Sequence, residues 1–419
     1  MGSGTPDLIR LKEYEDLPYA VLGEEGKRGL QRATEALKAP VFRFFLDHAQ
    51  AQQYVGVIKA GRHTVQILPK IHDDEGANLG YLLSLLGYAR KLRIRPSDVA
   101  EFDRLGGSFL EVWIRYFAGE LNRLLRRQYG HRYVEVEERT SFLRGKLLVE
   151  RELAGAAALS ARYACRYEVF TPDHLLNQVL KFCNGLLLKQ TRLASTRRLL
   201  RENDVMLADV AQKVIRAEDV DQIHLDRLNR GYEPILDLCR LLLKNSTLDL
   251  RAGRIAQLAF VFDMNLLFEE FVAEFVDRHS DKIRLGANRL AWVKKQQPLG
   301  KLFEKFGMKV DLILKDDTHH KVLLDTKYKT LGAQKDQQGL SQEDFYQMYA
   351  YGSAGERPYE DIVLLYPTTD VVQQTFTHGR MKLHVRQFDP RVIYNSERGQ
   401  PDEEAIVKEL NEALSILGS

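Results

Sequence analysis

Two aspartates and one lysine lie on two short apolar segments that a polar turn separates, within residues 309–329. Polar and apolar residues alternate with a period of two on both sides of the turn, which predicts an antiparallel hairpin. If the turn is centred on Thr318, Asp311 lies directly opposite Asp325 on one face of the hairpin. Lys327 then lies about 7 Å further along the same face. The spacing therefore brings two carboxylates and one ammonium group together.

Carboxylates that alternate with Leu, Ile and Val residues need a cation to compensate for their burial. A divalent metal ion is the natural candidate. Two oxygen ligands, from Asp311 and Asp325, suit Mg²⁺, which keeps several waters and leaves coordination positions for a phosphate. A lysine at the position of Lys327 can position or activate a water, or neutralise charge on a phosphate. The competing interpretation is a structural Asp–Lys ion pair, because Asp-x-Lys is a common pattern.

A third acidic residue is expected on a helix that precedes the hairpin. Residues 264–276 have apolar side chains at the spacing of one buried helical face. Glu269 falls at the border of that face, whereas Glu270 points away from it. Glu269 is therefore a candidate to support the metal site.

Further elements follow the hairpin in the sequence. Residues 344–351 are predicted to form a helix with Gln347 and Tyr351 one turn apart, and these two residues are candidates to support the site or to contact a ligand. Residues 361–366 form an apolar run typical of a buried strand. A further strand at 383–389 and a closing helix at 402–416 are expected.

Composition places the chain among ordinary globular proteins. It has 419 residues, 44% hydrophobic and 28% charged, with a net charge of +3. The three cysteines are widely spaced and form no Cys-x-x-Cys pair, so neither a structural zinc site nor a disulfide framework is indicated. The sequence contains no recognisable signal peptide and no long apolar span, and we expect a cytoplasmic protein without membrane contact.

The chain is expected to be a multidomain α+β protein. Residues 1–160 are interpreted as a β-rich N-terminal domain with helices. Within it, residues 7–71 are expected to be mostly β, including a hairpin of strands 54–59 and 64–71. Residues 161–250 are predicted to be a helical bridge, with helices near 207–216 and 233–244. Residues 251–419 are predicted to form an α/β domain that carries the candidate site.

The pattern of Asp311 followed by Asp325-Thr326-Lys327 on two apolar strands resembles the signature of PD-(D/E)xK nucleases. Val310 stands where the name of the signature has proline, a position that supplies no ligand. The resemblance implies a restriction-endonuclease-like core, and the order helix, hairpin, helix, strand agrees with it. By this resemblance Asp311, Asp325, Lys327 and Glu269 are catalytic, and Asp311 and Asp325 bind Mg²⁺. Gln347 and Tyr351 are then expected to support the site or to contact the DNA backbone.

Longer stretches resemble the McrC family, the nuclease subunits of McrBC modification-dependent restriction systems. They are residues 66–71 (QILPKI), 264–272 (MNLLFEEFV) and 346–351 (YQMYAY), together with the hairpin motif. The resemblance implies an endodeoxyribonuclease that cuts double-stranded DNA at sites of 5-methylcytosine type. It also implies a separate McrB-like AAA+ GTPase, which recognises the modified cytosine and on which the N-terminal part docks to stimulate GTP hydrolysis. The chain has no G-x-x-x-x-G-K-[ST] phosphate loop. This agrees with GTP hydrolysis by a separate subunit.

Two other functions are compatible with the same residues. A stand-alone PD-(D/E)xK nuclease of DNA repair or of another restriction type needs no ring partner. A non-enzymatic adaptor with a vestigial nuclease fold is the other possibility, and the intact Asp311, Asp325 and Lys327 argue against it. For the stimulation of the partner, basic residues of the β-rich region are candidates, such as Arg43, Lys59, Arg62 or Lys70.

Overall fold

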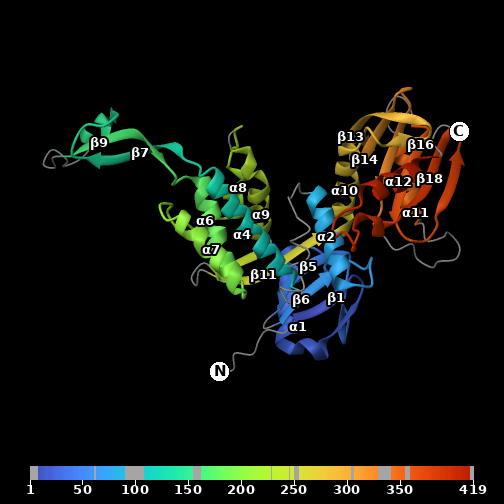
Figure 1. The fold of residues 1–419 in the computed structure, drawn as a ribbon, viewed down its shortest axis with the longest axis horizontal. Helices are drawn as coiled ribbons and strands as arrows, with labels where there is room; N and C mark the ends of the chain where they lie inside the picture. Colours follow the sequence, from blue (N-terminus) through green and yellow to red (C-terminus); the bar gives the residue numbers. More distant parts are fainter. Residues whose placement is uncertain are drawn as a thin grey trace. The chain divides into compact units, whose positions relative to one another are not determined.

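The computed structural model describes most of the chain, and its residues group into two compact units (Figure 1). The first unit comprises Met1–Phe109 and Ala259–Ser419, and the second comprises Leu110–Leu258. The described residues are 8–60, 63–89, 108–153, 162–227, 229–244, 246–249, 254–302, 306–328, 341–353 and 359–415.

In the first unit, the N-terminal residues form a sheet with strand order β1-β6-β5-β11. The strands are β1 (Leu8–Lys12), β5 (Tyr54–Ala60), β6 (His63–Leu68) and β11 (Arg254–Asp263). β5 and β6 pair in antiparallel register, so the predicted hairpin is confirmed. β1 runs parallel to β6, and residues 259–263 of β11 pair with β5. Strands that are far apart in the sequence therefore share one sheet.

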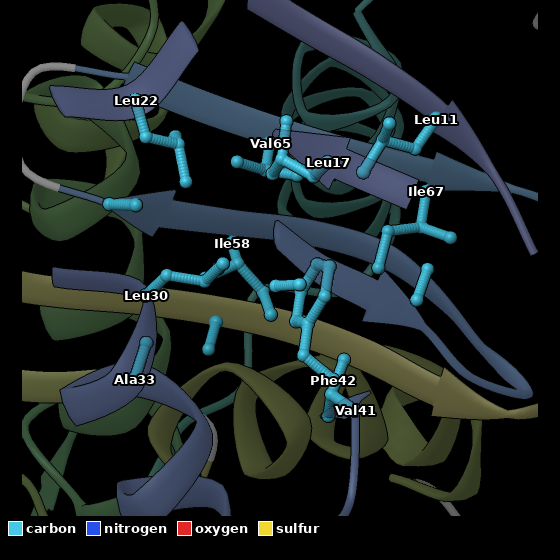
Figure 2. Close-up of a cluster of buried hydrophobic side chains, with 14 residues drawn as sticks. Leu11, Leu17, Leu22, Leu30, Ala33, Val41, Phe42, Ile58, Val65 and Ile67 are labelled. Atoms are coloured by element: carbon cyan, nitrogen blue, oxygen red, sulfur yellow. The ribbon is translucent and has the colours of Figure 1, made fainter. Parts of the chain in front are cut away.

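A long helix, α1 (Tyr19–Leu37), packs its apolar residues on this sheet, where Leu22, Leu30 and Ala33 join a buried cluster with sheet residues (Figure 2). The expectation of mostly β structure over residues 7–71 was therefore wrong for this segment. Gly23 has a φ of 65° and kinks the helix. Glycines lower intrinsic helix propensity by about 1 kcal/mol each, which explains why the local sequence did not indicate a helix. The short strands β2 (Asp16–Pro18), β3 (Phe42–Phe44) and β4 (His48–Ala51) form a small sheet beside it.

The C-terminal residues form a seven-stranded sheet of order β12-β13-β14-β15-β16-β18-β17. β14 (Phe306–Asp316) and β15 (Lys321–Thr326) are antiparallel, and their pairing of Leu312 with Leu324 and of Lys315 with Lys321 centres the turn on Thr318. The predicted hairpin and its register are confirmed. The other strands are β12 (Arg284–Leu285), β13 (Asn288–Leu302), β16 (Asp361–Pro367), β17 (Gln373–His378) and β18 (Met381–Phe388).

Helices cover both faces of this sheet. α11 (Gln342–Gly352) buries Met348 and Tyr351 against residues of β14, β15, β16 and β18. On the other face, α10 (Met264–Arg278) places Phe268 against Phe388 of β18, with ring centroids 5.9 Å apart. Further helices in the described part of this unit are α12 (Glu403–Leu414), α2 (Glu75–Ala89) and the short η4 (Pro390–Ile393). The predicted helices at 264–276, 344–351 and 402–416 are confirmed.

The second unit is mainly helical. The helices among its described residues are α4 (Phe109–Arg127), α5 (Val149–Leu153), α6 (Leu175–Leu188), α7 (Ala194–Met206), α8 (Ala217–Asp221), η3 (Arg230–Tyr232) and α9 (Glu233–Lys244). β7 (Arg132–Thr140), β8 (Lys146–Leu147) and β9 (Tyr163–Thr171) form a three-stranded sheet of order β7-β9-β8. β10 (Ser246–Asp249) pairs with the first part of β11. The predicted helix near 233–244 is confirmed, but 207–216 lies in turns and irregular backbone between α7 and α8.

The prediction of a mixed α+β chain with more than one domain is confirmed. The compact units do not follow the expected boundaries at 160 and 250, because residues 1–109 share a unit with the C-terminal sheet. The division of function among 1–160, 161–250 and 251–419 stays a prediction. None of the helices in the described ranges has the length and apolar character that crossing a membrane requires.

Candidate active site

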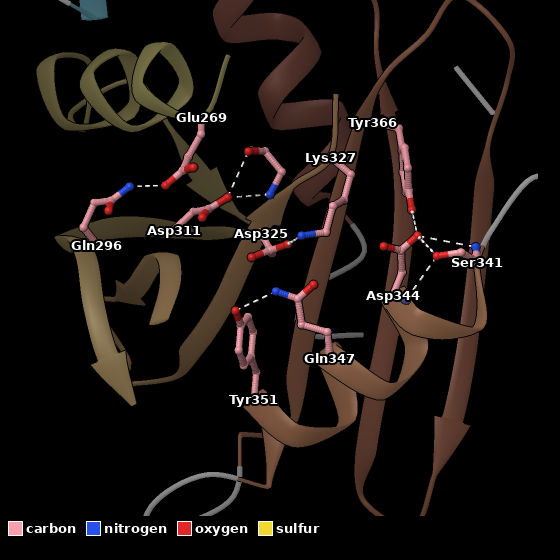
Figure 3. Close-up of polar contacts among 11 residues, drawn as sticks. Glu269, Gln296, Asp311, Asp325, Lys327, Ser341, Asp344, Gln347, Tyr351 and Tyr366 are labelled. Carbon is pink, nitrogen blue, oxygen red and sulfur yellow. Dashed lines mark hydrogen bonds and ion pairs between the residues drawn. The ribbon is translucent and has the colours of Figure 1, made fainter. Parts of the chain in front are cut away.

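The β14–β15 hairpin places Asp311 and Asp325 side by side, facing α11 (Figure 3). Asp325 is 2% exposed, so its carboxylate has left bulk water almost completely. One oxygen of Asp311, Oδ2, accepts hydrogen bonds from the backbone N and the Oγ1 of Thr326, at 2.8 and 2.9 Å. Both bonds go to the same oxygen of Asp311. The predicted convergence of the two aspartates is present in the fold.

Lys327 follows the last residue of β15 and turns its side chain back onto the same patch. Its Nζ lies 2.7 Å from Oδ2 of Asp325. The backbone N of Lys327 donates to the carbonyl oxygen of Leu365, 3.0 Å away, which extends the pairing of β15 with β16 by one step. Sheet pairing therefore fixes the backbone from which the lysine reaches the carboxylate.

Glu269 enters the site from α10. The helix begins after Asp263, whose side chain accepts a hydrogen bond of 2.9 Å from the backbone N of Asn265 and so caps it. One turn later Glu269 accepts a hydrogen bond from the side-chain amide of Gln296 on β13 and lies beside Asp311 (Figure 3). The helical row that distinguished Glu269 from Glu270 thus predicted which glutamate faces the hairpin.

α11 supplies the opposite wall. Its N-terminus is a capping box in which Ser341 and Asp344 exchange hydrogen bonds, so the helix starts at a defined residue. Gln347 donates from Nε2 to the hydroxyl of Tyr351 at 2.6 Å, and both side chains line the site. The predicted pairing of these two residues one turn apart is present, and their role in DNA contact stays a prediction.

Burial sets the electrostatics of the two aspartates. Burial is the largest cause that raises the pKa of Asp311 to about 7, the neighbouring Glu269 carboxylate contributes to this rise, and the hydrogen bonds from Thr326 oppose it. Burial likewise raises the pKa of Asp325 to about 7, and the charge of Asp311 adds to this, against the attraction of Lys327. Burial also raises the pKa of Glu269. The acids repel one another and lack enough positive charge nearby.

The pKa of Lys327 is raised as well, but for an ammonium group a raised pKa favours the charged form. Burial alone lowers the pKa of a lysine, but the charge of Asp325 and the hydrogen bond to it outweigh burial and raise the pKa of Lys327. Lys327 therefore carries a positive charge at neutral pH. The pocket lining holds two ammonium groups, those of Lys309 and Lys327, against five carboxyl groups, those of Glu269, Asp311, Asp325, Glu343 and Asp344. The site as a whole therefore still attracts a cation.

These residues line an open pocket of about 840 Å³. Carboxylate oxygens are the ligands that Mg²⁺ prefers, and Mg²⁺ typically uses only one or two of them beside its waters. Asp311 and Asp325 fit this requirement, because a divalent cation between them offsets the repulsion that raises their pKa values. Within the described ranges no group of three or more His, Cys, Asp or Glu is placed so that it could hold a metal ion.

Sequence reasoning missed several residues of this pocket. Lys309 lies on the face of Asp311, two residues before it, and the period-two alternation contained that signal. Gln296 gave no local signal. It donates to Glu269 from within β13, where its φ of 55° lies in the left-handed region. Thr326, Asn265 and Asp344 also line the pocket.

Glu269→Gln is expected to reduce any metal-dependent reaction at this site, but less than a change at either aspartate. Its carboxylate sits beside Asp311 and is already shared with Gln296. We expect a loss of about 10-fold in the rate of the chemical step, measured under single-turnover conditions. Glu270→Gln is the matched control on the same helix, and a larger loss for this control would reverse the assignment.

The chain resembles known proteins in sequence and in fold. The family described as "McrBC 5-methylcytosine restriction system component" matches residues 49–367. A comparison with curated proteins gives no match. The family match is therefore the sequence evidence for what this chain resembles, and it covers more than half of the chain.

Two solved structures from Thermococcus gammatolerans are similar to the chain. One is the refined half-complex from the tetradecameric assembly of McrB AAA+ hexamers with bound McrC, with a TM-score of 0.68, 21% identity, and coverage of 97% of this chain and 99% of that chain. The other is the McrBC complex solved by cryo-EM, with a TM-score of 0.51, 25% identity, and coverage of 66% of this chain and 89% of that chain. These matches confirm the resemblance to McrC that the motifs indicated. The chain belongs to the McrBC 5-methylcytosine restriction system component family.

Proposed function

We propose that this chain is the DNA-cutting subunit of an McrB-partnered restriction complex, a Mg²⁺-dependent endodeoxyribonuclease that acts on modified-cytosine DNA. The observation that carries the proposal is the convergence of Asp311, Asp325 and Lys327 with Glu269 in one open pocket. The order of α10, the β14–β15 hairpin, α11 and β16 supports a PD-(D/E)xK core. Such a core brings two acids and a lysine onto a hairpin beside a helix, as here.

Each side chain has a defined task in phosphodiester hydrolysis. Asp311 and Asp325 would hold Mg²⁺, which supplies Lewis-acid stabilisation of the charge that develops on the phosphate. Because Lys327 is held as an ammonium group 2.7 Å from Asp325, it positions the attacking water and neutralises charge and does not act as a general base. Attack by water on phosphorus breaks the bond to the 3′ oxygen and leaves 5′-phosphate and 3′-hydroxyl ends. One pocket cuts one strand, so a double-strand break needs two copies.

The N-terminal residues of the first unit are proposed to dock on the AAA+ partner and stimulate its GTP hydrolysis. Of the candidate cations, Arg43 on β3 and Lys70 after β6 are exposed, whereas Lys59 on β5 is half-buried. Arg62 lies outside the described residues. An exposed arginine or lysine at a subunit interface can supply charge to a phosphoryl-transfer transition state, which makes Arg43 and Lys70 the stronger candidates.

The proposal separates two activities, and one variant tests the separation. The wild-type chain, mixed with its co-purifying GTPase partner, is expected to cut modified DNA in the presence of Mg²⁺ and to raise GTP turnover. Asp325→Asn is expected to lose cleavage and to raise GTP turnover as the wild type does, because Asp325 is buried in the pocket, away from the surface. Both activities are measured in the same reaction with modified and unmodified DNA.

The outcomes also separate the alternatives. Cleavage by the wild-type chain without any partner would support a stand-alone nuclease. Stimulation of GTP turnover without cleavage under any Mg²⁺ condition would support an adaptor. A chain that neither binds the partner nor cuts DNA would contradict the proposed function.

A further inference from the structure

A buried acid near the N-terminus contacts the end of the strand that carries Asp325. Glu13 follows β1 and is 2% exposed. Its Oε2 accepts a hydrogen bond of 2.9 Å from the hydroxyl of Tyr328 and one of 3.3 Å from the backbone N of Lys70. The backbone N of Glu13 donates to the carbonyl oxygen of Leu68, 3.0 Å away. The N-terminal sheet and the strand of the candidate site are thus joined through one carboxyl group.

Tyr328 connects this acid to the candidate site on two sides. It follows Lys327 directly in the chain, so the direction of the lysine backbone depends on where the tyrosine ring is held. The ring packs against Phe268, with centroids 5.9 Å apart, and Phe268 precedes Glu269 on α10. Tyr328, held at its hydroxyl by Glu13, is therefore next to Lys327 in the chain and in contact with Phe268, which is next to Glu269.

The hydrogen bond joins two neutral groups. Burial raises the pKa of Glu13 to about 8, against the hydrogen bonds from Tyr328 and Lys70, with a further rise from the charge of Asp263. Burial also raises the pKa of Tyr328 and of the nearby Tyr81 well above the usual value. A neutral carboxyl group escapes the large cost of burying a charge and still accepts from its donors.

We propose that Glu13 and Tyr328 are positioning residues of the candidate active site, which hold Lys327 in reach of Asp325 from the N-terminal sheet. The inference rests on the proposed nuclease function. Neither residue touches the pocket: their effect passes through the backbone of Lys327 and through Phe268. A side chain displaced by about 1 Å can cost up to about 100-fold in rate, so loss of the anchor lowers the rate of the chemical step and leaves DNA affinity unchanged.

The chain offers a matched control for this pair. Tyr88 on α2 donates from its hydroxyl to Oε1 of Glu403 on α12, at 2.6 Å. Like the bond between Glu13 and Tyr328, this bond joins a residue from the N-terminal part of the first unit to one from its C-terminal part. Neither Tyr88 nor Glu403 is next to a pocket residue in the sequence. A role in general stability predicts similar effects of Tyr88→Phe and Tyr328→Phe, whereas a positioning role predicts an effect of Tyr328→Phe alone.

The experiment compares full-length Glu13→Ala, Glu13→Gln, Tyr328→Phe and Tyr88→Phe with the wild type, each with the partner, Mg²⁺ and modified DNA. Glu13→Ala and Tyr328→Phe are expected to lower the single-turnover rate by about 10- to 100-fold with unchanged DNA affinity. Glu13→Gln is expected to stay within about twofold at pH 7, because its amide oxygen accepts the same bonds as a neutral carboxyl group. Tyr88→Phe is expected to match the wild type.

Hydrogen exchange provides a readout that does not need cleavage. The backbone N of Lys327 donates to Leu365, and its exchange is expected to be faster in Tyr328→Phe than in Tyr88→Phe, with both variants folded by thermal unfolding. If the wild type fails to cut DNA, the proposed function fails, and this difference in exchange still tests the anchor. Equal exchange in the two variants, a wild-type rate for Tyr328→Phe, or a Glu13→Gln loss as large as that of Glu13→Ala would each overturn the inference.

Discussion

Replacing Asp325 with asparagine is expected to abolish DNA cleavage while leaving the chain folded and more stable than the wild type. The carboxylate is the group best placed to hold a divalent cation opposite Asp311, and the loss of such a ligand costs about 10²-fold or more in rate. Asparagine is isosteric and uncharged, so it removes the repulsion that contributes to the raised pKa of Asp325. Catalysis and stability therefore change in opposite directions.

The measurement pairs single-turnover cleavage with thermal unfolding at about pH 8, where the carboxylates are ionised. Asp311→Asn is expected to behave in the same way. Lys327→Ala is the contrasting variant: it should also lose cleavage, but it should lower the melting temperature, because it leaves Asp325 buried without the ammonium group 2.7 Å away. Wild-type cleavage by Asp325→Asn in Mg²⁺ would refute the site assignment.

The sequence was most informative where a local period decided the geometry. Alternation on both sides of Thr318 predicted the register of β14 and β15, because a shift of one residue would turn Asp311 out of the site and its apolar neighbours out of the core. The helical row on α10 distinguished Glu269 from Glu270 for the same reason. Both are contacts between residues whose separation in sequence sets their separation in space.

Local periods carried no information on contacts set by irregular backbone. Gln296, which donates to Glu269, has a φ of 55° within β13, and no composition signal marks such a position. The kink at Gly23 in α1 had a similar effect, since glycine reads as a helix breaker. In both cases tertiary packing decided the conformation against the local preference.

The contact between Glu13 and Tyr328 also lay beyond sequence reasoning. A single acidic residue after a strand is normally solvated, and its partner is 315 residues away. The expected boundary at 160 assumed that the N-terminal residues pack among themselves, but residues 1–109 and 259–419 form one compact unit. An excised N-terminal fragment would lose the partner of the buried Glu13 carboxyl group. The full-length chain is therefore the right material for tests of partner stimulation.

Removing Mg²⁺ is expected to abolish cleavage and, above neutral pH, to lower the stability of the folded chain. The pKa values of Asp311 and Asp325 are raised to about 7 in the fold. A carboxyl group whose folded pKa is raised stabilises the fold fully below its unfolded pKa, and this contribution is lost as the pH rises through the folded pKa. The free energy of unfolding of the metal-free chain should therefore fall between about pH 4 and pH 7.

Mg²⁺ should reverse this loss, because it binds the ionised form. With Mg²⁺ at about 10 to 100 times its dissociation constant, the gain at about pH 8 is about 1–3 kcal/mol, seen as a higher melting temperature. At about pH 5.5 protons compete for the same oxygens, and the Mg²⁺ effect should nearly vanish. The double variant Asp311→Asn with Asp325→Asn is the control, and its melting temperature should not respond to Mg²⁺ at either pH. An equal Mg²⁺ response in the double variant and the wild type would place the metal elsewhere, because the two carboxylates would then not be its ligands.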